Sequence, residues 1–235
     1  MEKRLTQEQI DQLFEFTKKH YVEYYDVQVE LVDHLANAIE AEWKENPAIS
    51  FEDALNVEFK KFGIFGFTGL VEQKQAELHK YYNKMLWNEV LKFISIPKVI
   101  LTVAMYLLIF FFLKEAGSLG EIVIPSLVLG SFLYFLIDGF RFVYKIKKQQ
   151  KSKQRNWLIQ SVAQSVFSLP IIGVGGYCQM VYSFFEKQFA LSNISIHFLT
   201  AFSLLQFICI YVLYKIIKPK LLQSIKETEK KYQFA

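Results

Sequence analysis

Residues 99–113 read VILTVAMYLLIFFFL and contain no charged side chain. A helix needs roughly 20 apolar residues to cross a hydrocarbon layer of about 30 Å, because each residue advances about 1.5 Å along the axis. With Pro97 at its start, where a missing N–H does no harm, this stretch predicts a membrane-spanning helix over residues 96–113. Three further apolar stretches have the required length. They predict spans over residues 122–144, 157–185 and 194–217.

Charge divides the chain into two parts. Residues 1–92 hold 11 Lys and Arg against 17 Asp and Glu, whereas residues 93–235 hold 16 against 6. The whole chain is apolar, with 52% hydrophobic and 17% aromatic residues. We therefore expect an all-α protein, built from an N-terminal cytosolic helical domain and a four-helix transmembrane bundle. The predicted boundaries are 1–92 for the acidic domain, 93–218 for the bundle and 219–235 for a basic cytosolic tail.

The distribution of Lys and Arg predicts the orientation, because these side chains resist translocation and collect on the cytoplasmic side. The loop between the second and third spans carries only basic charges: Arg141, Lys145, Lys147, Lys148, Lys151, Lys153 and Arg155. The tail after residue 217 is also rich in Lys, and the other two loops are not. We expect a multi-pass protein of the cytoplasmic (inner) membrane with both termini in the cytoplasm. The N-terminus lacks the apolar segment of a cleavable secretory signal, so the first span is the expected insertion signal.

Local start and stop signals divide the acidic domain into helices. A capping-box pattern at Thr6 predicts the start of the first helix. A second helix is expected from near residue 26 to residue 45, with its apolar side chains on one stripe. Ser50 is the expected N-cap of a third helix, and Gly63 its left-handed C-cap. A fourth helix is predicted over residues 70–91 and leads to the membrane.

One segment of this domain resembles a known family. Residues 27–63, VQVELVDHLANAIEAEWKENPAISFEDALNVEFKKFG, are similar to the HAAS domain, a small α-helical module found in bacteria ahead of transmembrane segments and as a prefix on some permeases. The shared features are an acidic helix with Asp33-His34-Leu35, the SFEDAL stretch and the closing Phe62-Gly63. The resemblance implies a regulatory or protein-interaction module, often linked to PadR-type transcription regulators. Its motifs are structural rather than catalytic.

The acidic helix carries one candidate interaction surface, made of Glu30, Asp33 and His34. Glu30 and His34 lie one helical turn apart and could offer a carboxylate and an imidazole to a divalent cation. The spacing is common in charged helices, and no second pair of ligands is evident. We therefore expect a solvated or partner-facing acidic face and no metal site.

The basic loop carries a second candidate surface, Lys147, Lys148 and Lys151. Membrane topology alone accounts for such a cluster, but two further interpretations stay open. The lysines could contact anionic lipid headgroups, or the acidic N-terminal domain could lean on them. No nucleic-acid motif accompanies them, so a nucleic-acid partner is not expected.

Polar side chains inside the predicted spans are costly in hydrocarbon and therefore tend to face a partner or a cavity. Asp138 and Arg141 are three positions apart on the second span, which fits an ion pair near the cytoplasmic interface. A proton or substrate pathway is the alternative. Gln160 and Gln164 share one face of the third span and are expected to form hydrogen bonds across helices.

The third span also contains helix-breaking and small residues: Pro170, Gly173, Gly175 and Gly176. Together they can kink the helix and let another backbone approach closely. A broken helix can line a substrate site in a transporter, but inverted repeats would accompany it, and the sequence has none. Close packing is the interpretation that we favour.

No catalytic, cofactor or metal motif stands out in the sequence, so none of these sites is predicted and the chain is not expected to be an enzyme. We predict a non-catalytic integral membrane protein. It would act as a regulatory or accessory subunit that binds a membrane protein partner, or further copies of itself, through its cytosolic domain and bundle. The alternative is a small transporter or channel component that works as an oligomer. A lipid-modifying enzyme that uses His34 or His197 is a third, less favoured class.

Overall fold

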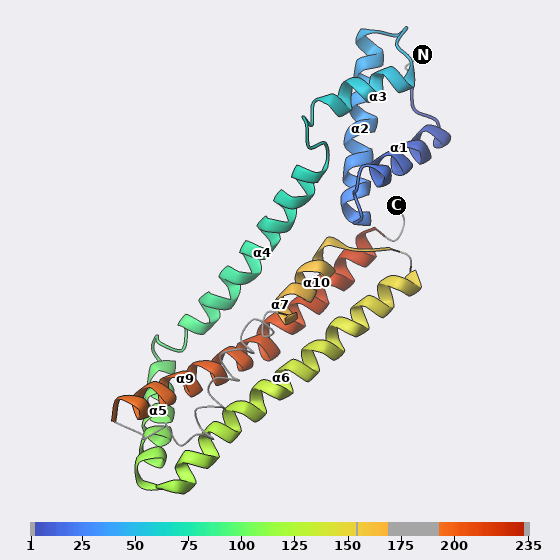
Figure 1. Ribbon diagram of the computed structural model, residues 1–235. Coiled ribbons are helices and arrows are strands. Elements are labelled where there is room, and N and C mark those ends of the chain that lie inside the picture. Colours follow the sequence, from blue (N-terminus) through green and yellow to red (C-terminus); the bar gives the residue numbers. More distant parts are fainter. Residues whose placement is uncertain (1–2, 154, 169–192, 233–235) are drawn as a thin grey trace. The chain divides into compact units, whose positions relative to one another are not determined.

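The computed structural model describes residues 3–153, 155–168 and 193–232, with the side chains of Ser118, Glu121 and Asn193 excepted. In these residues all regular secondary structure is helical, which confirms the predicted all-α fold (Figure 1). The chain divides into two compact units. The first comprises Met1–Lys80, Gln149–Val162 and Ser224–Ala235, and the second comprises Tyr81–Lys148 and Ala163–Gln223.

Local signals set the first helices. These are α1 (Gln7–Lys19), α2 (Tyr25–Glu45), α3 (Phe51–Lys60) and α4 (Thr68–Leu91). At the start of α1, the Thr6 hydroxyl accepts from the Gln9 backbone at 3.3 Å, and the Gln9 side chain accepts from the Thr6 backbone at 2.9 Å. The Ser50 hydroxyl caps α3 by accepting the Asp53 N–H at 3.1 Å. Both predicted caps are confirmed, and each satisfies backbone donors that a helix start leaves unpaired.

The core of the first unit gathers around one face of α2. Its buried side chains include Val27, Leu31, Leu35, Ile39 and Trp43, as the apolar stripe predicts. Other members come from the neighbouring helices: Leu13, Ala54, Leu55, Phe67 and Val71. Leu158 also belongs to this core, although 132 residues separate it from the start of α2. The predicted boundaries at 1–92, 93–218 and 219–235 concern the membrane and stay predictions.

A short loop between α3 and α4 closes the domain. Gly63 and Gly66 have positive φ angles of 77° and 52°, a left-handed conformation that favours glycine. Gly63 thus has the predicted left-handed conformation, but the C-cap of α3 is Lys61, which keeps a right-handed helical backbone. Phe67, directly after the loop, is fully buried, and its ring lies 4.8 Å from that of Phe62 and 5.0 Å from that of Phe59. The loop conformation therefore follows from two glycines and an aromatic anchor.

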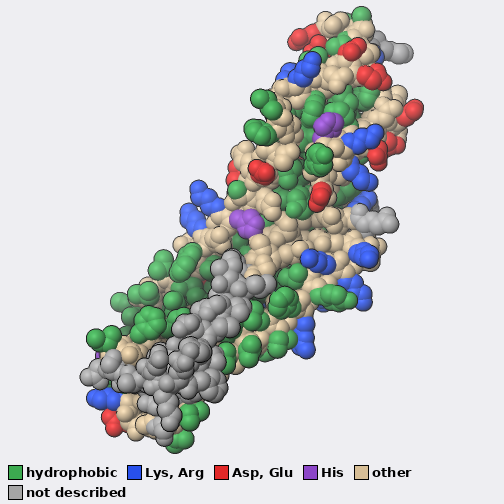
Figure 2. Space-filling view, in the orientation of Figure 1, with side chains coloured by type: hydrophobic (Ala, Val, Ile, Leu, Met, Phe, Trp, Pro, Cys, Tyr) green, Lys and Arg blue, Asp and Glu red, His purple; other side chains and the backbone are tan. Residues whose placement is uncertain are grey.

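The second unit is built on long apolar helices. Its elements are the end of α4, α5 (Lys98–Glu115), most of α6 (Ser118–Lys153), the end of α7 (Leu158–Ser168), α9 (Asn193–Val212), the π-helical turn η1 (Leu213–Ile217) and the start of α10 (Lys218–Lys231). Ile109, Leu113, Ile124, Val128 and Leu199 form a buried cluster between α5, α6 and α9. Many other large apolar side chains of this unit lie on its surface, as Figure 2 shows in green.

Two stretches of helix, Ile122–Lys153 and Ile194–Lys231, are long and apolar enough to cross a membrane. They contain the predicted spans at 122–144 and 194–217. The helix at the first predicted span, α5, is only 18 residues long. Because it includes three charged residues, Lys98, Lys114 and Glu115, it lacks an uninterrupted apolar stretch of that length. Most of the predicted span at 157–185 lies outside the described residues. By length and composition, the structure thus supports two of the four spans.

Contacts between α5 and α9 fix their relative direction. Phe93, just before α5, lies 5.9 Å from Tyr211 between ring centres. Further along, the Tyr106 hydroxyl hydrogen-bonds Nδ1 of His197 at 2.6 Å. From Phe93 to Tyr106 the residue number rises, whereas from their partners Tyr211 to His197 it falls. The two helices are therefore antiparallel.

The helices α6 and α9 run in the same direction instead. The Gln206 side chain donates to the Val128 carbonyl at 2.8 Å. Further toward the C-terminal ends of both helices, the Tyr214 hydroxyl donates to Asp138 at 2.7 Å. Residue numbers rise together along both helices, so α6 and α9 are parallel. Any chain that joins two parallel helices must first return along their length.

Candidate functional site

The N-terminus of α2 holds a distant segment of the chain in the first unit. The Asp26 carboxylate accepts the backbone N–H of Leu158 at 3.2 Å from Oδ1 and 3.4 Å from Oδ2. Next to it, the Tyr25 backbone N–H donates to the Asn156 carbonyl at 2.7 Å. We call these four residues the clasp. It fixes the connection between α6 and α7 on the acidic helix.

Asp26 pays a desolvation penalty in this position. Burial raises the pKa of its carboxyl, and the hydrogen bond from Leu158 opposes that rise only in part. The nearby negative charge of Glu30 adds to the rise. The clasp therefore favours a protonated or neutral group at position 26 more than water does.

Glu30, one turn further along α2, contacts two other segments. Its carboxylate is paired with Lys74 of α4 and accepts the Tyr232 hydroxyl at 3.1 Å. Burial alone would raise its pKa, but the hydrogen bond and charge of Lys74, with help from Tyr232, lower it. Glu30, which the sequence singles out as part of an interaction surface, is therefore engaged inside the unit.

Aromatic and cationic side chains surround the clasp. The Arg155 guanidinium lies over the Tyr25 ring at 4.1 Å. Trp157 meets the edge of Tyr25 at 5.7 Å and stacks on Tyr232 at 6.0 Å. These contacts join α2, the α6–α7 connection and the C-terminal end of α10 within one unit. The aromatic rings bury area, and the guanidinium gains from the ring face.

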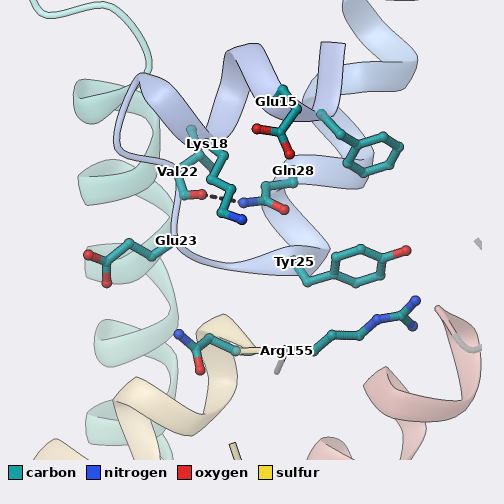
Figure 3. A pocket seen from close by; sticks show the side chains of 9 residues that line it. Glu15, Lys18, Val22, Glu23, Tyr25, Gln28 and Arg155 are labelled. Carbon is teal, nitrogen blue, oxygen red and sulfur yellow. Dashed lines mark hydrogen bonds between the residues drawn. The ribbon is translucent and has the colours of Figure 1, made fainter. Parts of the chain in front are cut away.

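A pocket of about 460 Å³ opens beside the clasp, lined by Phe14, Glu15, Lys18, Val22, Glu23, Tyr25, Gln28, Arg155 and Asn156. Figure 3 shows Glu15 and Lys18 extending from α1 toward Gln28, whereas Glu23 points away from Tyr25 and Arg155. Gln28 is held by a hydrogen bond to the Val22 carbonyl. Both signs of charge line this pocket, so it has no clear preference for a cation or an anion.

The other predicted surface residues lie outside the clasp. Asp33 and His34 are exposed on α2, and the His34 ring lies 6.1 Å from that of Phe62. Lys147, Lys148 and Lys151 are exposed on α6. The basic connection does contact the acidic domain, as one of our interpretations expected. The contact is made by Arg155 and by the backbone around Leu158, however, rather than through those lysines.

In the second unit, Asp138 forms the centre of a polar cluster. Lys218 donates to its carboxylate at 2.6 Å, and the Tyr214 hydroxyl donates at 2.7 Å. The sequence predicted an ion pair between Asp138 and Arg141. Among the described residues, Asp138 instead pairs with Lys218. Tyr214 lies in the π-helical turn η1, a distortion that is frequent at functional positions. The Asp138 cluster closes the contact between α6 and the parallel helix.

Both glutamines of the predicted third span, Gln160 and Gln164, lie on α7. Gln160 is 1% exposed and accepts hydrogen bonds from the Gln150 side chain at 3.0 Å and the Trp157 backbone at 3.3 Å. The bond from Gln150 crosses from α6 to α7, as predicted. Gln164 lies one turn further along α7. The predicted packing residues Pro170, Gly173, Gly175 and Gly176 lie outside the described part of the chain.

Sequence reasoning missed the partners of the clasp. The sequence pattern does not single out Asp26, and it marks Arg155 only as a basic residue of a loop. Trp157 and Tyr232 are aromatic residues that border charged segments, which is the one available signal, but such residues are also common where a membrane meets water. No three His, Cys, Asp or Glu side chains group closely enough to hold a metal ion in the residues that the structure describes. Comparison with models of known protein families, with curated proteins and with solved structures found no match to this chain.

Proposed function

We propose that this chain is a four-span protein of the cytoplasmic membrane that acts as a non-catalytic regulatory or accessory subunit. The apolar surface of the second unit carries the membrane part of this proposal. Only 28% of the apolar window in Ile122–Lys153 and 44% of that in Ile194–Lys231 is buried inside the protein. A core helix of a soluble protein would be mostly buried, whereas these helices present Phe140, Phe198 and similar side chains outward.

The helix directions support four crossings. An N-terminus in the cytoplasm makes the first and third spans run outward and the second and fourth run back. The antiparallel α5 and α9 and the parallel α6 and α9 have the directions that this order requires. The basic α6–α7 connection and the basic α10 would then both lie on the cytoplasmic side.

The partner surface that we propose lies on the loop between α3 and α4. Ile64 is 100% exposed and Phe65 is 81% exposed, and the left-handed Gly63 and Gly66 on either side define the shape of the loop. Two neighbouring apolar side chains on a short, defined loop suit a protein contact. The exposed His34 lies beside the same loop through its contact with Phe62. The resemblance to HAAS-type modules, which implies protein interaction, points the same way.

Extraction and reporter fusions test the membrane part. We expect the chain to stay with membranes in carbonate and to require detergent for release. Reporters fused at either terminus should be active only on the cytoplasmic side, and a reporter placed after Ala116 only on the other side. Release by carbonate, or an external terminus, would refute the proposed topology.

Co-purification in mild detergent tests the partner part. An Ile64→Ser/Phe65→Ser variant should lose a partner that the wild-type chain retains. Tyr21→Asn is the matched control, because Tyr21 is also exposed and asparagine tolerates its left-handed backbone, with φ of 65°. Equal retention by both variants would contradict the proposed surface.

The Asp138 cluster is the one feature that favours the alternative, a small transporter or channel component that works as an oligomer. A charged side chain in a span often marks an ion or proton path. Solute flux in proteoliposomes that vanishes with Asp138→Asn would support transport. Our proposal instead expects no flux above that of empty liposomes, and a purely structural effect of this substitution.

A further inference from the structure

A second pocket of the first unit differs from the one beside the clasp in its charge. Its volume is about 660 Å³, and it is lined by Lys153, Arg155, Trp157, Lys226, Glu229 and Lys230. One of these residues is the last of α6, two come from the connection between α6 and α7, and three come from α10. All belong to the same compact unit.

Positive charge dominates this pocket. Four of its side chains are cationic, and its only carboxylate, that of Glu229, is paired with Lys153 at 2.9 Å. The Arg155 guanidinium has no carboxylate within 4 Å in the described part of the chain. Its contacts are the Tyr232 carbonyl at 3.5 Å and the face of the Tyr25 ring. Figure 3 shows Arg155 extending past Tyr25 toward the C-terminal helix. An arginine is always charged, and the described residues supply no counter-ion for this one.

One side chain that lines the pocket, that of Trp157, carries a buried hydrogen-bond donor without a partner among the described residues. Trp157 is 3% exposed, and its indole Nε1 is buried without an acceptor among the residues that the structure describes. An indole N–H can only donate, and a buried donor without a partner costs about 1–3 kcal/mol. Native structures usually satisfy such groups with protein, water or a ligand. The pocket thus has an excess of cationic side chains, and one of its lining residues holds a buried donor that needs an acceptor.

We propose that this pocket binds a phosphate-bearing anion. A phosphate offers several strong acceptor oxygens, which match the fork of Arg155 and the point charges of Lys226 and Lys230. One oxygen could also accept the indole N–H of Trp157 after a small side-chain shift. The phosphate group of a soluble metabolite and that of an anionic lipid headgroup share this chemistry. The inference goes beyond the proposed function. Of the two phosphate sources, only the lipid headgroup requires the proposed membrane location.

Isothermal titration calorimetry on the full chain in neutral detergent tests the site. Three probes are titrated separately: inorganic phosphate, dihexanoyl phosphatidylglycerol and dihexanoyl phosphatidylcholine. The wild type should bind at least one of the first two and not the third. Binding of inorganic phosphate indicates a soluble ligand. Binding of phosphatidylglycerol without binding of inorganic phosphate indicates a lipid headgroup.

Matched double variants separate the pocket from general surface charge. Lys226→Gln/Lys230→Gln removes two exposed charges that line the pocket. The control variant Lys147→Gln/Lys148→Gln removes two exposed charges of α6 that do not line the pocket. We expect the dissociation constant to rise about tenfold in the first variant and less than twofold in the second. None of these lysines has a buried side chain, so folding should be unaffected.

Trp157→Phe tests the indole donor, because it removes the N–H and keeps an aromatic ring. Anion affinity should fall about tenfold, as expected for loss of one hydrogen bond to a charged group. Without anion the melting temperature should stay the same or rise, since an unpaired buried donor disappears. The proposal would be overturned if neither inorganic phosphate nor phosphatidylglycerol bound. Equal losses of affinity in the two lysine double variants would also overturn it.

Discussion

Asp26 on α2 accepts the backbone N–H of Leu158 at the start of α7, across 132 positions of sequence. The bond joins the acidic domain to the connection that leaves α6, and both partners belong to the first unit. Leu158 also packs into the apolar core of that domain. The clasp is therefore an integral part of the first unit.

Substitutions at Asp26 should separate its charge from its hydrogen bond. Asp26→Asn keeps an oxygen that can accept from Leu158 and removes the charge that burial disfavours, so its stability at pH 7 should equal or exceed that of the wild type. Asp26→Ala leaves the Leu158 N–H without an acceptor and should lower the free energy of unfolding by about 1–2 kcal/mol. Thermal unfolding in detergent measures both. A similar loss in the two variants would show that the charge itself stabilises the clasp.

The same carboxyl predicts a pH dependence. Because the pKa of Asp26 is raised above its ordinary value of 3.8, the folded state binds this proton more tightly than the unfolded chain. The Asp26 contribution to stability is therefore full below pH 3.8 and is lost as pH rises through the raised pKa. Glu30, with a lowered pKa, has the opposite trend below about pH 4.5. The difference in melting temperature between wild type and Asp26→Asn should thus change across this range, and a constant difference would contradict the assignment.

Two loop glycines offer a matched test of backbone strain and packing. Gly63 and Gly66 both have left-handed backbones, which cost an alanine about 1–2 kcal/mol. A methyl group at Gly66 would also lie 3.0 Å from the Phe59 ring, whereas nothing lies within 4 Å at Gly63. Gly66→Ala should therefore be the more destabilising variant, by about 1 kcal/mol. Denaturant unfolding followed by circular dichroism measures this difference, and equal losses would exclude a packing role for Gly66.

Local signals predicted the helices of the N-terminal domain well. The caps at Thr6 and Ser50 and the left-handed Gly63 depend on residues within a few positions of each other, so the sequence states them directly. The stripe of α2 was equally clear, because the helical period alone places Leu31, Leu35 and their neighbours on one face.

Partners on other helices could not be predicted in the same way. Spacing along one helix suggested Arg141 for Asp138, but the observed partner, Lys218, lies 80 positions away. Leu158 is still more remote from Asp26, at 132 positions. Such pairs depend on how the helices pack, and a single sequence contains no periodic signal for that. The same limit explains why the clasp was missed while its helices were found.

Two glycines of α6 provide a control for helix packing in the second unit. A methyl group at Gly139 would lie 2.8 Å from the Phe167 carbonyl oxygen of α7, whereas nothing lies within 4 Å at Gly130. Alanine is the better helix former by about 1 kcal/mol, so Gly130→Ala should be neutral or stabilising. Gly139→Ala should lower the melting temperature in detergent, because α6 and α7 must move apart. If both variants behave alike, the close approach of the two helices is not needed for stability.

A double-mutant cycle decides whether Asp138 and Lys218 form a structural pair. Their side chains are only 27% and 20% exposed, so removal of either charge leaves the other poorly compensated. Asp138→Asn and Lys218→Met should each lower the free energy of unfolding by about 2 kcal/mol. The combined variant should lose less than the sum, with a coupling of about 1 kcal/mol or more. Tyr214→Phe, which removes only one donor to Asp138 at 2.7 Å, should cost about 1 kcal/mol and leave the ion pair in place. Additive losses in the cycle would mean that the two charges act separately, and the polar cluster would then have to be explained by a role other than holding α6 against its parallel neighbour.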